Sequence, residues 1–97
     1  MIINYTVNGT VWTALSTAGQ SGSVFVAEDD TNLCPVDVRI MHTTGTPVSG
    51  DFTKSKRIYK SIKNDDVLPC SADSSTDIYY ARCKNADDSI IISADFI

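Results

Sequence analysis

Residues 36–42 read Val-Asp-Val-Arg-Ile-Met-His, and this stretch gives the clearest indication of the fold. Successive side chains of a β-strand point to opposite faces of its sheet, so an alternation with a period of two is typical of a strand with one buried face. The stretch divides in this way, with Val36, Val38, Ile40 and His42 on one face and Asp37, Arg39 and Met41 on the other. We therefore predict a strand over residues 36–42.

Seven further segments have strand-like patterns and are bounded by turn residues. The dipeptide Asn8-Gly9 between two such segments is the strongest short-range sign of a hairpin, so residues 2–7 are predicted to pair with residues 10–16. Pro69 indicates an edge strand or a bulge within residues 67–71. The remaining predicted strands are residues 23–28, 56–60, 77–83 and 89–96.

The number and spacing of these segments predict the fold class. Seven or eight short strands with frequent turn signals are typical of an all-β protein, a small antiparallel sandwich or barrel. A chain of 97 residues is long enough for one core, so residues 1–97 are expected to form a single β domain. The segment 77–83 allows an immunoglobulin-like sandwich, although Ala81 stands where that family places a Tyr, two positions before Cys83.

Composition excludes some classes of partner. Eight Lys and Arg residues against twelve Asp and Glu give a net charge of −4. Binding to nucleic acid or to an anionic membrane surface needs an excess of positive charge, so we expect neither partner. No segment approaches the roughly 18 consecutive apolar residues of a membrane-spanning helix.

The three cysteines, Cys34, Cys70 and Cys83, are odd in number and contain no Cys-x-x-Cys pair. The first residues lack the basic and small-residue features of a signal peptide, so synthesis in a reducing cytoplasm is expected. Buried free thiols are then the preferred interpretation, because free Cys packs as a small apolar residue. A bridge between Cys34 and Cys83 remains the alternative.

Residues that could carry catalysis are scarce. His42 is the one histidine, and the chain has no His-Glu-x-x-His, Gly-x-Ser-x-Gly or phosphate-binding loop motif. The acidic pairs at 29–30, 65–66 and 87–88 could offer oxygens to Ca²⁺, but they lack the order of a calcium loop and are interpreted as turns. We predict a protein that is not an enzyme, with no catalytic, cofactor-binding or metal site.

A cluster of basic residues is the candidate interaction patch. Five of the eight basic side chains fall within ten positions: Lys54, Lys56, Arg57, Lys60 and Lys63. Lysines along an edge strand discourage sheets from joining edge to edge, which is one interpretation. The other is a contact patch for an acidic partner, including another copy of the chain, whose binding would be sensitive to salt.

Three segments, residues 11–22, 36–40 and 77–83, resemble small virion structural proteins of tailed bacteriophages. The resemblance implies a non-enzymatic β domain assembled in the host cytoplasm into a virion. It further implies a capsid decoration, head-fibre-base or tail-accessory protein that packs against other virion proteins, commonly as a homo-oligomer. No residue roles follow from it.

A carbohydrate-binding or adhesion module is the alternative function. Aromatic side chains can act as flat platforms for ligands, and the candidates are Trp12, Tyr59, Tyr79 and Tyr80. Two or more of them exposed on one flat face would favour this alternative, whereas burial in the core would argue against it.

Overall fold

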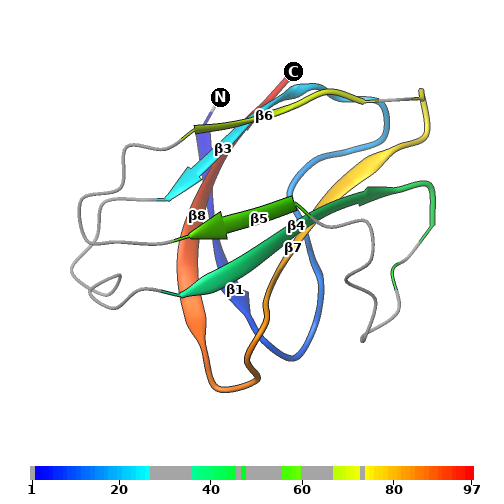
Figure 1. The fold of residues 1–97 in the computed structure, drawn as a ribbon. Helices are drawn as coiled ribbons and strands as arrows, with labels where there is room; N and C mark the ends of the chain where they lie inside the picture. Colours follow the sequence, from blue (N-terminus) through cyan, green and yellow to red (C-terminus); the bar gives the residue numbers. More distant parts are fainter. Residues whose placement is uncertain (1, 27–35, 46, 48–55, 60–66, 73) are drawn as a thin grey trace.

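A computed structural model of the chain describes residues 2–26, 36–45, 47, 56–59, 67–72 and 74–97 (Figure 1). These residues form eight strands and no helix. The strands are β1 (Ile2–Asn8), β2 (Thr13–Ala14), β3 (Gly22–Val26), β4 (Asp37–Thr43), β5 (Lys56–Tyr59), β6 (Val67–Cys70), β7 (Ile78–Cys83) and β8 (Ser89–Phe96).

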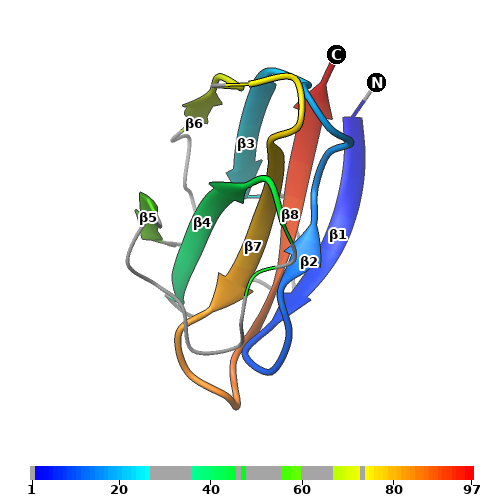
Figure 2. The same cartoon turned by 90° about the vertical axis from the view of Figure 1, so that its right-hand side faces the viewer.

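The strands form two antiparallel sheets that face each other (Figure 2). The first sheet has the order β1-β8-β3-β6 and the second the order β2-β7-β4-β5. This order of eight strands is that of a jelly roll, which consists of two Greek keys. The predicted antiparallel sandwich is confirmed. Its order differs from the immunoglobulin arrangement, because β8 pairs with β1 and β3 and lies in the opposite sheet from β7.

The predicted hairpin at Asn8-Gly9 is wrong, because β1 pairs with β8 whereas β2 pairs with β7 in the other sheet. Gly9 does not have the positive φ that a type I′ turn requires. Instead, the Asn8 side-chain oxygen accepts the N–H groups of Thr10 and Val11 at 3.0 and 3.1 Å, and the chain crosses from one sheet to the other. Gly9 is needed here because a Cβ at this position would collide with the main chain of Asn85.

Alternating side chains from both sheets fill the core. The prediction for β4 is confirmed, since Val38 and Ile40 are fully buried in it. Met41 is also buried although it lies on the opposite face, so polarity does not alternate strictly along this strand. The buried core residues are Val7, Leu15, Val24, Val26, Val38, Ile40, Cys70, Tyr79, Ala81, Cys83, Ile90, Ile92 and Ala94.

The turn between β7 and β8 contains the acidic pair Asp87-Asp88. The Asp88 N–H donates to the Asn85 carbonyl at 3.1 Å, and the Asn85 amide donates to an Asp88 carboxylate oxygen at 3.2 Å. This pair therefore forms a turn, as predicted. The pairs at 29–30 and 65–66 lie outside the described residues.

Candidate functional site

The predicted basic patch lies partly on β5, an edge strand of the second sheet. Lys56 and Arg57 belong to β5, and they pair in register with Ile40 and Arg39 of β4. The other three members of the patch, Lys54, Lys60 and Lys63, lie outside the described residues. Two basic residues on an edge strand agree with the interpretation that they discourage edge-to-edge association.

The four edge strands of the two sheets differ in how well they are protected against pairing with another chain. Edges are commonly blunted by short length, proline or charge. β2 has two residues, β6 has four residues including Pro69, and β5 has four residues including Lys56 and Arg57. β1 has seven residues and carries neither a charge nor a proline. It is therefore the unprotected edge among the described strands.

The side chains of β1 leave much of this edge open to solvent. Ile2 and Ile3 are 58% and 46% exposed, and Asn4 and Thr6 are also exposed. Figure 2 shows β1 forming one flank of the molecule, with β8 as its neighbour in the sheet. The Ser93 hydroxyl of β8 donates to the Asn4 side-chain oxygen at 2.6 Å, which ties β1 to its neighbouring strand.

A pocket of about 250 Å³ opens beside β1, between the two sheets. It is bounded by β1, by β8 and by the segment that follows β2. Its walls combine two aromatic rings and three aliphatic side chains with polar groups of the 16–20 segment. The lining residues are Ile3, Tyr5, Leu15, Ser16, Thr17, Gln20, Ala94 and Phe96.

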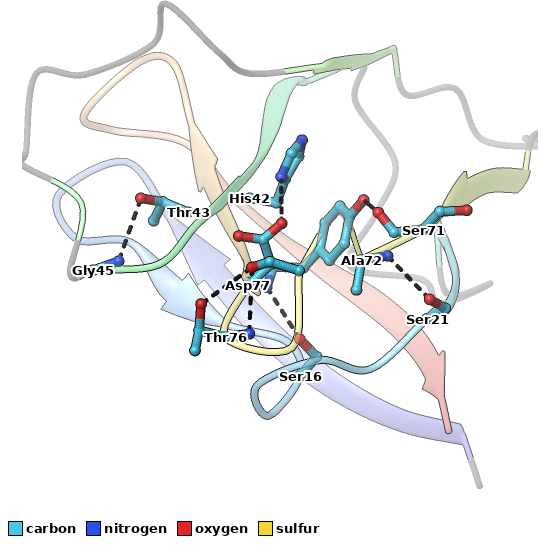
Figure 3. Close-up of polar contacts among 11 residues, drawn as sticks. Ser16, Ser21, His42, Thr43, Gly45, Ser71, Ala72, Thr76 and Asp77 are labelled. Atoms are coloured by element: carbon cyan, nitrogen blue, oxygen red, sulfur yellow. Dashed lines mark hydrogen bonds and ion pairs between the residues drawn. The ribbon is translucent and has the colours of Figure 1, made fainter.

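His42 and Asp77 form a polar pair at one end of the sandwich (Figure 3). The His42 Nδ1 and Asp77 Oδ2 atoms are 3.3 Å apart, and the two side chains are 25% and 8% exposed. The imidazole also lies against the Tyr79 ring, with ring centroids 5.3 Å apart. The sequence did not reveal this pair, because 35 positions separate its members.

The main chain beside the His42–Asp77 pair holds neighbouring segments in place. The Gly19 N–H donates to the Asp77 carbonyl at 2.8 Å, so the Asp77 main chain holds the loop before β3. The Ser16 hydroxyl accepts the Tyr79 N–H at 3.0 Å, which ties the segment after β2 to the start of β7.

Two of the three cysteines, Cys70 and Cys83, lie in described segments, and both are buried thiols that are not part of a disulfide. Burial, together with the negative charges of Asp88 and Asp37, raises the pKa of the Cys83 thiol to about 11. Cys83 therefore remains a protonated thiol at neutral pH and donates to the Val7 carbonyl at 3.6 Å. The alternative bridge between Cys34 and Cys83 is not formed, and Cys34 itself lies outside the described residues.

Within the described ranges, no group of three or more His, Cys, Asp or Glu residues is placed to hold a metal ion. The same ranges contain no helix with the length and apolarity to cross a bilayer. No family model, curated protein or solved structure matches this chain.

Proposed function

We propose that this chain is a non-enzymatic structural protein of a tailed-bacteriophage virion that acts by packing against other virion proteins. It would serve as a capsid decoration protein or as a head or tail accessory protein, assembled in the host cytoplasm. The observation that carries the proposal is the unprotected β1 edge with its half-exposed Ile2 and Ile3. An open strand edge offers main-chain hydrogen bonds to another polypeptide, so protein contacts are the chemistry it suits best.

The proposal of a virion protein comes from the sequence resemblance, and the jelly-roll architecture is compatible with it. Jelly rolls serve as viral capsid domains, but they also serve as lectins, so the fold alone decides little between the two classes. Of the proposed stacking aromatics, Tyr79 is only 1% exposed and donates its hydroxyl to the Ser71 carbonyl at 2.7 Å. Tyr79 therefore cannot serve as a platform for a sugar, while Trp12 and Tyr80 are half-buried.

Co-sedimentation with empty capsids and with isolated tails tests the proposal. We expect the chain to pellet with one of these particles in a fixed ratio. We expect Thr6→Lys, which puts a charge on β1, to reduce that binding at least several-fold. Val67→Lys is the matched control, because Val67 is an exposed outward position on β6, the opposite edge of the same sheet.

Two results would contradict the proposal. The first is a chain that ignores both particles but binds a glycan, which would make the carbohydrate-binding alternative correct. The second is equal binding by wild type and Thr6→Lys, which would show that the β1 edge does not carry the interaction.

A further inference from the structure

We propose that β1 pairs antiparallel with β1 of a second copy of this chain, around a two-fold axis at Tyr5. The two first sheets would then join into one continuous sheet across the dimer. The inference rests on the proposed function in one respect. It takes the β1 edge as a site of protein contact and names a second copy of the chain as the polypeptide that pairs with it. Its geometry follows from the register of β1 and from the pocket beside it.

The burial pattern of β1 restricts the register of such a pair. Val7 lies in the core, and Tyr5 and Ile3 line the pocket, so the odd-numbered side chains face inward. Directly opposed residues of an antiparallel pair point to the same face, so inward positions must meet inward positions. Pairing all seven residues of β1 with those of its copy satisfies this condition.

In that register, Ile3 faces Val7 of the copy, Asn4 faces Thr6 and Tyr5 faces Tyr5. A shift by two residues would keep the faces matched but would leave two residues of each strand unpaired. The strand is therefore self-complementary about its central residue, which is the condition for a closed two-fold interface.

Charge favours a second copy as the occupant. The chain carries a net charge of −4, so most surfaces of two copies repel each other at moderate salt. β1 is uncharged along its whole length, and two copies of it can approach without placing like charges together. The β5 edge, with Lys56 and Arg57, would instead bring positive charges together in the same arrangement.

The pocket provides a second reason for a strand at this edge. Its walls come from β1 and β8 of the first sheet and from residues 15–20, which follow β2 at the edge of the second sheet. β1 and β2 lie at the same flank of the sandwich (Figure 2). A strand added beside β1 therefore runs along the pocket. The inward-facing Tyr5 of the second copy would continue the apolar layer that Tyr5 and Ile3 of the first copy form.

The size of the contact predicts a modest affinity. Stable interfaces bury about 1,200–2,000 Å² in total, and weak ones bury less. One pair of seven-residue strands with a few flanking side chains lies at the low end of this range. We therefore expect a dimer whose population rises with protein concentration, with dissociation in the micromolar range.

Light scattering after size exclusion, over a hundredfold range of concentration, tests the pairing. We expect wild type and Val67→Lys to pass from monomer to dimer, and Thr6→Lys to remain monomeric throughout. Thermal unfolding of each variant is the control that shows whether the substitution leaves the fold intact. A wild type that stays monomeric at the highest concentration overturns the inference, as does a Thr6→Lys variant that dimerises as the wild type does.

Disulfide trapping tests the register separately. Tyr5→Cys places the two new thiols directly opposite each other, so oxidation should give a covalent dimer. Thr6→Cys faces Asn4 of the copy and should give much less. Cross-linking that is equal at the two positions, or stronger at position 6, contradicts the axis at Tyr5.

The outcomes also separate this inference from the proposed function. A monomer that still binds virion particles through β1 overturns the pairing and leaves the function. A dimer that binds no virion particle overturns the function and leaves the pairing.

Discussion

The Arg82 guanidinium donates two hydrogen bonds to the Gly9 carbonyl, at 3.0 Å from Nε and 2.9 Å from Nη2. Arg82 belongs to β7 of the second sheet, whereas Gly9 follows β1 of the first. This contact therefore links the two sheets at the point where the chain crosses between them. It holds in place the segment that the sequence predicted to be a hairpin turn.

Arg82→Lys should destabilise the protein, because an ammonium group cannot make the same paired contact with one carbonyl. We expect the free energy of unfolding to fall by about 1.5–3 kcal/mol, the range for hydrogen bonds that involve a charged group. Urea denaturation measures the change. Lys84→Arg, at an exposed neighbouring position, is the control and should leave the stability unaltered.

Gly22→Ala should be strongly destabilising, because the new Cβ would collide with the Asp95 carbonyl where β3 pairs with β8. Overpacking of this kind costs about 1–3 kcal/mol. Gly45→Ala is the matched control, since a Cβ there meets nothing within 4 Å. Thermal unfolding of the two variants should differ clearly, and equal melting temperatures would contradict the packing at Gly22.

Tyr79→Phe should remove the hydrogen bond to the Ser71 carbonyl and keep the ring contacts with His42 and Phe96. The Ser71 carbonyl loses this partner, so we expect the free energy of unfolding to fall by about 1 kcal/mol. Tyr80→Phe, at a half-buried position of the same strand, should change the stability less. The comparison requires only equilibrium denaturation of the two variants.

The raised pKa of Cys83 predicts a loss of stability in alkali. In the unfolded chain the thiol ionises near pH 9, whereas in the folded protein it keeps its proton until about pH 11. The contribution is fully present below pH 9 and is lost as the pH rises to about 11, by at most about 3 kcal/mol. Cys83→Ala should show a shallower decline than wild type over this interval. Parallel declines would contradict the raised pKa.

Reversing the charge of the basic patch tests its role directly. The triple variant Lys56→Glu, Arg57→Glu, Lys60→Glu should bind virion particles less tightly than wild type, and the difference should shrink at high salt. Particle binding that is unchanged in the triple variant removes the patch from the interaction. The lysines would then act only as protection of the β5 edge.

The positions of the strands could be predicted from the sequence, because alternation is a local property of a few consecutive side chains. Residues 36–42 correspond to β4 within one residue at each end, and the prediction for residues 89–96 coincides with β8. The pairing of strands could not be predicted in the same way. Asn8-Gly9 has the residues typical of a hairpin turn, but β1 pairs with β8, which is distant in the sequence, instead of with the segment that follows the turn.

Some features of the candidate site were likewise determined by the sequence alone, and others only by the tertiary structure. That β1 carries no charge and no proline was decided by the amino-acid sequence alone, as was the cluster of lysines near residue 57. That β1 is an edge, that a pocket lies beside it and that His42 meets Asp77 were decided only by the tertiary structure. Each of these depends on contacts between residues far apart in the chain, and such contacts form only when the two sheets close over a common core.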